Sequence, residues 1–138
     1  MVTLVDTSVF ARRANPAIFE DVRVLIASGR AATCPPVMFE VLHSARNAVE
    51  FAAVRAELEE LVLLPIGPAE WRRALDVYQR LAESGGAHQR SVPHPDLLAA
   101  VAAEAAGAEV LHYDEDFDRI AAITGQPTRW IAPRGSLD

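Results

Sequence analysis

The chain has 138 residues, 51% of them hydrophobic, which is enough for one domain with its own core, so we expect a single domain over residues 1–138. Its formal net charge of −6 argues against a protein held on nucleic acid by an overall positive field. All 13 basic residues are arginine, which excludes P-loop and Schiff-base chemistry because both need lysine.

The first half of the chain alternates short apolar runs with segments that open on helix caps. Val2 to Val5 is a continuous, largely β-branched run that stops at Asp6, which is typical of a buried strand. Asn15 before Pro16 opens a helix that Gly29 ends. We expect, by residue number, strand 2–5, helix 7–13, helix 15–28, strand 31–34, helix 35–46, helix 47–61, strand 63–66 and helix 68–82.

The last third of the chain has the clearest boundaries. Pro95 and Asp96 open an alanine-rich helix that Gly107 ends, and a strand over 109–112 follows. A helix over 118–123, a turn over 125–127 and a last strand over 129–131 complete the chain. Strands that alternate with helices indicate an α/β fold with a mainly parallel central sheet flanked by helices.

The sequence favours neither a membrane-spanning nor a secreted protein. No stretch approaches the roughly 20 apolar residues of a membrane span, and the run from Met1 to Val5 is too short for a signal peptide, so a soluble cytoplasmic protein is expected. Cys34 is the single cysteine, which excludes an intrachain disulfide and a cysteine zinc site and indicates a small buried residue.

Carboxylates stand where predicted strands end or predicted helices begin. They are Asp6 after the first strand, Glu40 in an early helix, Asp96 at the start of the alanine-rich helix, and Asp114 and Asp116 after strand 109–112. Ligands of parallel sheets gather at the carboxyl ends of the strands, so these acids are expected to converge. Converging buried carboxylates need a divalent cation among them, and oxygen-only ligands favour Mg²⁺ or Mn²⁺.

Each acid also has a purely structural interpretation. Asp6 and Asp96 are placed to be helix N-caps, and Glu40 lies where a helix dipole favours an acid. Asp114 and Asp116 belong to a charged segment that would suit a solvated turn. The four histidines share no metal-ligand spacing, and none is interpreted as catalytic: His43, His88, His94 and His112.

The acidic motifs occur together in one order over essentially the whole chain. They are Val5-Asp6-Thr7-Ser8, Glu40, Pro95-Asp96-Leu97-Leu98-Ala99-Ala100 and Tyr113-Asp114-Glu115-Asp116-Phe117. This combination resembles a PIN domain and, more narrowly, the VapC ribonuclease toxins of bacterial toxin–antitoxin pairs. There is one departure, because many relatives have Thr-X-Asp where this chain has His112-Tyr113-Asp114.

The resemblance implies a three-layer PIN-like fold and a metal-dependent endoribonuclease toxin. Its implied catalytic and metal-binding residues are Asp6, Glu40, Asp96 and Asp114, with Asp116 as a further metal ligand. The cofactor would be Mg²⁺ or Mn²⁺, which activates a water for in-line attack on an RNA phosphodiester. The resemblance also implies a homodimer and a cognate antitoxin that neutralises the activity.

Four residues close to Asp6 are candidates for contact with substrate. Thr7 and Ser8 are placed to bind a carboxylate or a substrate phosphate, and equally to be plain helix caps. Arg12 and Arg13 are placed to meet phosphates, although solvated or ion-paired arginines are the commoner case.

Proteins of other classes share part of this acidic pattern. Phosphoaspartate receivers and haloacid-dehalogenase-type phosphatases share an early strand-end aspartate, but both need a lysine that this chain lacks. A PIN-type nuclease of RNA processing or decay, without an antitoxin, is one alternative. A catalytically degenerate PIN interaction module is another, and it is expected to have lost at least one of the four acids that this chain retains.

Overall fold

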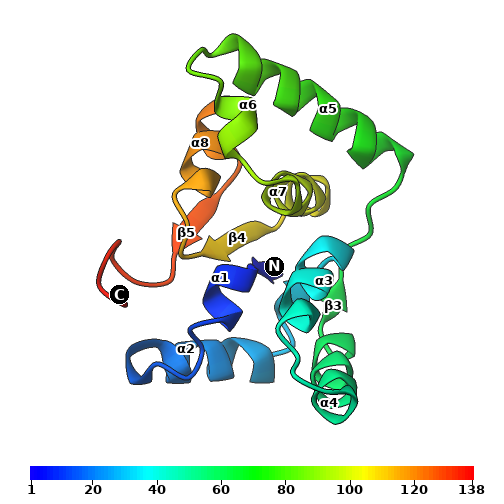
Figure 1. Ribbon diagram of the computed structural model, residues 1–138, viewed down its shortest axis with the longest axis vertical. Helices are drawn as coiled ribbons and strands as arrows, with labels where there is room; N and C mark the ends of the chain where they lie inside the picture. Colours follow the sequence, from blue (N-terminus) through cyan, green and yellow to red (C-terminus); the bar gives the residue numbers. More distant parts are fainter.

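A five-stranded parallel sheet runs through the centre of the computed structural model, which describes residues 1–138 (Figure 1). The strands are β1 (Thr3–Val5), β2 (Ala31–Thr33), β3 (Val62–Leu63), β4 (Glu109–His112) and β5 (Thr128–Trp130). They lie in the order β3-β2-β1-β4-β5, and every pairing is parallel. The predicted α/β fold with a mainly parallel sheet is therefore confirmed.

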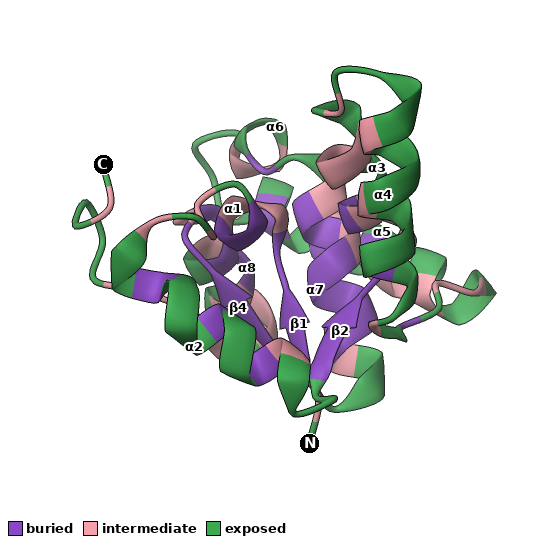
Figure 2. Ribbon diagram, turned by 90° about the horizontal axis from the view of Figure 1, so that it is seen from below, coloured by how far each residue is buried: buried purple, intermediate pink, exposed green.

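Helices cover both faces of the sheet. They are α1 (Thr7–Phe10), α2 (Pro16–Ala27), α3 (Pro35–His43), α4 (Ala48–Glu59), α5 (Pro68–Glu83), α6 (His88–Ser91), α7 (His94–Ala106) and α8 (Asp116–Thr124). In both views α2 lies on one face of the sheet, while α5, α7 and α8 lie on the other (Figures 1 and 2). The helices α3 and α4 pack against each other on the β3 side of the molecule (Figure 1).

The direction in which the chain crosses the sheet changes between β1 and β4. The chain passes from β1 to β2 to β3 toward one edge, and then returns to β4 and β5 on the other side of β1. In open parallel sheets, such a switch point leaves a crevice at the carboxyl ends of the two strands. Asp6 follows β1 there, and its backbone N–H donates to the Leu111 carbonyl of β4 at 3.0 Å.

The centre of the core is α7, whose buried surface is coloured purple in Figure 2. Four of its buried residues are alanines, at positions 99, 100, 102 and 103. Small side chains let a helix approach the sheet closely, and this brings the first turn of α7 up to the carboxyl end of β1. Cys34 is buried as expected, and burial raises the pKa of its thiol to about 11.

Several boundaries differ from those expected, most of them by one to three residues. The helix α1 ends at Phe10 rather than Arg13, and α6 was not expected. The strand β3 covers Val62–Leu63 rather than 63–66, because Pro65 has no N–H to donate to the ladder. The helix α8 begins at Asp116 rather than 118. None of the helices combines the length and the apolar character that crossing a membrane requires.

Candidate metal centre

Five carboxylates converge at the switch point of the sheet. Asp6 follows β1, Glu40 lies on α3, Asp96 is in the first turn of α7, Asp114 follows β4, and Asp116 is in the first turn of α8. Their oxygen atoms form two groups, each within 4.8 Å: Asp6, Glu40 and Asp96 in the first, and Asp96, Asp114 and Asp116 in the second. The predicted convergence is therefore present, and Asp96 belongs to both groups.

The two oxygens of Asp6 have different surroundings. Oδ2 accepts the backbone N–H of Ser8 at 2.9 Å and the Ser8 hydroxyl at 2.6 Å, so Asp6 is the N-cap of α1. Oδ1 is buried and has no hydrogen-bond partner. The Ser8 hydroxyl in turn accepts the Tyr113 N–H at 2.9 Å, which ties the end of β1 to the loop after β4. Capping thus uses one oxygen and leaves the other buried without a partner.

Asp96 is a buried acid at the start of α7 whose pKa is strongly raised. Its side chain is buried, and Oδ2 has no hydrogen-bond partner. Burial first, and then the charges of the neighbouring carboxylates, with Asp6 the largest of these, together raise the pKa of Asp96 to about 8. In the absence of a cation, the fold therefore favours a protonated Asp96 near neutral pH.

Glu40 is the more open member of the first group. The Thr7 hydroxyl donates to its Oε1 at 3.2 Å, which places this carboxylate beside α1. Burial and then the charge of Asp6 raise the pKa of Glu40, and the Thr7 hydrogen bond opposes this. Glu40 also lines a cavity of about 220 Å³ between α1, α3 and α4, which gives solvent access to the cluster.

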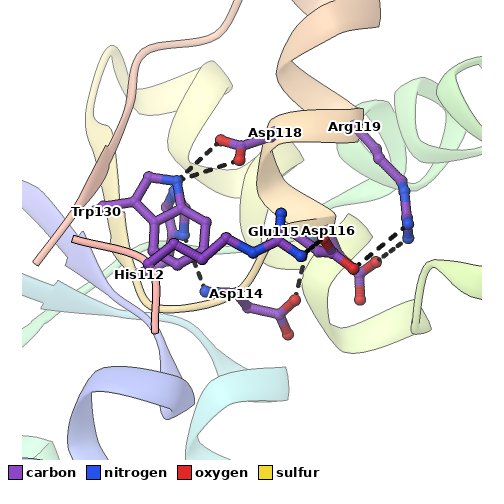
Figure 3. A network of polar contacts seen from close by, with 8 residues as sticks. His112, Asp114, Glu115, Asp116, Asp118, Arg119 and Trp130 are labelled. Atoms are coloured by element: carbon purple, nitrogen blue, oxygen red, sulfur yellow. Dashed lines mark hydrogen bonds and ion pairs between the residues drawn. The ribbon is translucent and has the colours of Figure 1, made fainter. Parts of the chain in front are cut away.

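The second group is held by hydrogen bonds and an ion pair, drawn in Figure 3. Asp114 Oδ1 accepts the backbone N–H of Asp116 at 3.0 Å. Arg119 donates from Nη1 to Asp116 Oδ1 at 2.8 Å. Burial and the charge of Asp114 raise the pKa of Asp116, while Arg119 lowers it.

Arg119 is a member of the site that the sequence did not reveal. Residues three apart on a helix face each other, so Asp116 and Arg119 meet because both lie on α8. The three-residue spacing between Asp116 and Arg119 could have indicated this pair. It was missed because the helix was expected to begin only at Asp118, which left Asp116 outside it.

The arginines that the sequence did propose lie beside the cluster without touching its carboxylates. Arg12 stacks over the Tyr113 ring at 4.6 Å and donates to the Ser8 carbonyl at 3.0 Å. Arg13 forms an ion pair with Glu57 at 2.8 Å. The Thr7 hydroxyl donates to Glu40, and the Ser8 hydroxyl donates to Asp6. Of the roles considered for these two residues, each therefore binds a carboxylate.

The donor set fits a divalent cation. Its atoms are carboxylate oxygens, which are hard ligands of the kind that Mg²⁺ and Mn²⁺ take. Two of them, Asp6 Oδ1 and Asp96 Oδ2, are buried with no hydrogen-bond partner, which is costly for an ionised group. A cation between them would satisfy both.

The family model described as PIN domain matches residues 3–123. Ribonuclease VapC18 of Mycobacterium tuberculosis is 43% identical over 137 residues, which span 99% of this chain and 100% of that protein. The chain belongs to the VapC family of PIN-domain proteins. Another VapC protein of the same organism, Ribonuclease VapC51, is 42% identical over 98% of this chain and 96% of its own length.

Solved VapC-containing structures have the same fold. The DNA-bound VapBC complex of Salmonella typhimurium superposes with a TM-score of 0.75 at 18% identity, over 96% of this chain and 99% of the other. VapBC-5 of Mycobacterium tuberculosis, described as a member of the VapBC family of toxin–antitoxin systems, superposes with a TM-score of 0.59 at 27% identity, over 94% and 96%. The resemblance to VapC found in the sequence is confirmed.

Proposed function

We propose that this VapC-family chain is a metal-dependent endoribonuclease that hydrolyses RNA phosphodiester bonds, with residues 1–138 as one PIN domain. The observation that carries the proposal is the pair of buried, unpartnered oxygens, Asp6 Oδ1 and Asp96 Oδ2, at the switch point of the sheet. The relatives named ribonucleases support the RNA substrate, because they are similar over almost the whole chain.

We assign Asp6 and Asp96 as the primary metal ligands, with Glu40, Asp114 and Asp116 completing the site. The cofactor is Mg²⁺ or Mn²⁺, and when bound it lowers the pKa of water and neutralises charge on the scissile phosphate. Asp96 has to lose its proton to take part, since its pKa is raised to about 8 in the absence of a cation. Binding of the cofactor is therefore coupled to release of a proton from the chain.

The neighbouring side chains orient the ligands. Ser8 fixes one oxygen of Asp6 and so directs the other toward Asp96. Thr7 fixes one oxygen of Glu40. We propose Thr7, Ser8, Arg12 and Arg13 as weak substrate contacts. Arg12 is the strongest candidate of the four, because the carboxylate nearest to its guanidinium, that of Asp138, is 3.7 Å away.

The proposed partner is a cognate antitoxin protein. VapBC-5, at 27% identity, is described as part of a toxin–antitoxin system, and this supports a partner of the same kind here. A basic side chain of the antitoxin would compete with the cation for the acidic cluster. A homodimer is also proposed, because large apolar side chains on α3, α4 and α5 are exposed: Phe39, Val49, Trp71 and Leu75. We place the activity in the cytoplasm, where RNA is found.

The test is cleavage of purified RNA by the purified chain. We expect cleavage with Mn²⁺ or Mg²⁺ that EDTA abolishes and that Asp6→Asn removes. Failure of the wild-type chain to cleave any RNA in the presence of either cation would overturn the nuclease proposal.

Co-expression with the neighbouring short reading frame tests the antitoxin. A stable complex that no longer cleaves RNA is the expected result. A neighbour that neither binds nor inhibits would replace the toxin assignment with that of an RNA-processing nuclease. The degenerate module is disfavoured because all five acids are present and converge.

A further inference from the structure

The buried histidine His112 lies at the edge of the acidic cluster, beside Asp114. It is the last residue of β4 and has no exposed surface. Its ring packs between Phe117 of α8 and Trp130 of β5, with a ring-centroid distance of 5.0 Å to each. Figure 3 shows His112 next to Trp130, with a dashed line joining its ring to the backbone nitrogen of Asp114.

One nitrogen of this ring holds the backbone of the acidic loop. The Asp114 N–H donates to His112 Nδ1 at 3.2 Å. An imidazole nitrogen accepts only when it carries no proton, so this contact requires a neutral ring with its proton on Nε2. Nε2 is buried without a hydrogen-bond partner.

The ring cannot easily turn away from the loop. Trp130, which packs against one side of it, is itself fixed because its Nε1 donates to both carboxylate oxygens of Asp118, at 3.1 and 3.3 Å. Phe117 on the other side is completely buried. The position of Nδ1 is therefore set by β5 and α8 together.

The hydrogen bond between His112 and the Asp114 N–H also affects the positions of the carboxylates of the second group. His112 fixes the N–H of Asp114, and the Asp114 carboxylate accepts the N–H of Asp116. Both acids lie within reach of Asp96. A loop backbone fixed at Asp114 thus sets where two of the five carboxylates stand.

We propose that His112 is a positioning residue: its unprotonated Nδ1 fixes the Asp114 N–H and so directs the Asp114 and Asp116 carboxylates toward Asp96. The inference rests on the proposed function, because the orientation of the Asp114 and Asp116 carboxylates affects activity only if they bind a cation.

Two substitutions separate the acceptor from the packing. In His112→Asn, the side-chain oxygen stands where Nδ1 was and can accept the same N–H, whereas His112→Leu has no acceptor. Both remove the ring from between Phe117 and Trp130. A buried asparagine costs more to desolvate than a leucine, so a purely structural role for His112 makes the asparagine variant the worse one.

The first measurement needs no metal. Nitrogen-15 chemical shifts of the wild-type His112 ring are expected to show a protonated Nε2 and a bare Nδ1. Hydrogen exchange of the Asp114 amide is expected to be at least about tenfold faster in His112→Leu than in the wild-type chain, with His112→Asn close to wild type. A proton on wild-type Nδ1 would overturn the inference, even if both variants fail to fold.

The second measurement is the affinity for Mn²⁺ alone, by calorimetric titration. We expect about tenfold weaker binding by His112→Leu and a much smaller loss in His112→Asn, because outer-shell partners are worth roughly 10- to 100-fold in metal affinity. Equal losses in the two variants, or a larger loss in His112→Asn, would contradict the positioning role.

The outcomes also distinguish this inference from the proposed function. If the wild-type chain binds Mn²⁺ and cleaves RNA while the two variants bind Mn²⁺ alike, the positioning role fails and the nuclease stands. If the wild-type chain neither binds Mn²⁺ nor cleaves RNA while the Asp114 amide responds as expected, the proposed function fails and His112 is only an anchor of the loop.

Discussion

The two groups of carboxylates share Asp96 but are stabilised in opposite ways. In the first group, Asp6 and Glu40 face Asp96 with no basic side chain paired to any of the three. In the second group, Asp116 is paired with Arg119, and Asp114 accepts a backbone N–H. The comparison shows that only hydrogen bonds offset the repulsion in the first group, whereas an ion pair also offsets it in the second, where the pKa of Asp116 nevertheless stays raised by burial and Asp114.

The largest effect is expected from removing a charge in the first group. Asn caps a helix as well as Asp does, so Asp6→Asn keeps the cap of α1 while it removes a metal ligand. Asp96→Asn removes the residue that both groups share. RNA cleavage by either variant is expected to fall by orders of magnitude, while the Tm of the metal-free chain holds or rises because repulsion is relieved.

Asp21→Asn is the matched control, since Asp21 is exposed on α2. It is expected to leave cleavage and Tm unchanged. Undiminished cleavage by Asp6→Asn or Asp96→Asn would contradict the assignment of the first group as the metal site.

The next effect is a pH dependence of stability that originates in the first group. The folded-state pKa of Asp96 is raised from 3.8 to about 8, so the folded chain binds a proton that the unfolded chain has released over this interval. The stabilisation is complete below 3.8 and is lost as pH rises toward about 8. We therefore expect the Tm of the metal-free chain to fall across this range, as measured by calorimetry with a chelator present.

Two further measurements sharpen this result. Asp96→Asn is expected to flatten the fall in Tm, because its amide does not titrate. Added Mn²⁺ is expected to raise the Tm more at high pH than at low pH, since the cation replaces the proton. A metal-free Tm that rises between 3.8 and about 8 would contradict the expected contribution of a protonated Asp96.

The sequence predicted the first group better than the second. Asp6 and Asp96 each stand beside a sharp chain signal, namely the end of an apolar run and a proline. The strand order was not predictable from these signals, because it depends on which side of β1 the chain returns to after β3. Convergence of the acids could be expected, but their division into two groups could not.

The second group depends on contacts that spacing alone does not reveal. The Asp114 carboxylate accepts the Asp116 N–H, and α8 begins at Asp116, two residues before the predicted start. Arg119 therefore lies beside Asp116 on the same helix. His112 was interpreted as background because it shares no spacing with a metal ligand. Its position emerges only from packing among Phe117, Trp130 and the loop.

A smaller effect, opposite in direction, is expected from Arg119→Gln in the second group. Loss of the ion pair with Asp116 is expected to destabilise the chain by only about 0.5 kcal/mol, since Arg119 is partly exposed. Mn²⁺ affinity is expected to increase by about threefold, because a competing positive charge has been removed from the cluster. Titration calorimetry with Mn²⁺ measures this.

Arg55→Gln provides the control for Arg119→Gln. Arg55 pairs with Glu59 on α4 at 2.7 Å, in the same kind of helical ion pair but away from the cluster. Its loss is expected to lower stability by a similar amount and to leave Mn²⁺ affinity unchanged. Weaker Mn²⁺ binding by Arg119→Gln would mean that the pair with Asp116 holds the acid in place instead of competing with the cation.

An effect of comparable size is expected from Thr7→Val, which tests how far the first group depends on a single hydrogen bond. Valine keeps the branched shape of threonine but cannot donate to Glu40, whose oxygen lies 3.2 Å from the Thr7 hydroxyl. Such a bond contributes roughly 0.5 to 1.5 kcal/mol, so Mn²⁺ affinity is expected to fall by about two- to tenfold. The variant should regain its cleavage rate when Mn²⁺ is saturating.

Thr128→Val, on β5, controls for the change from threonine to valine outside the acidic cluster, and it is expected to leave Mn²⁺ affinity and KM unaltered. The informative quantity for Thr7→Val is the KM for RNA at saturating Mn²⁺. An unchanged KM means that Thr7 acts only by holding Glu40. A raised KM with unchanged Mn²⁺ affinity would instead mean that the Thr7 hydroxyl leaves Glu40 to bind a substrate phosphate, and that the first group needs no such support to bind its cation.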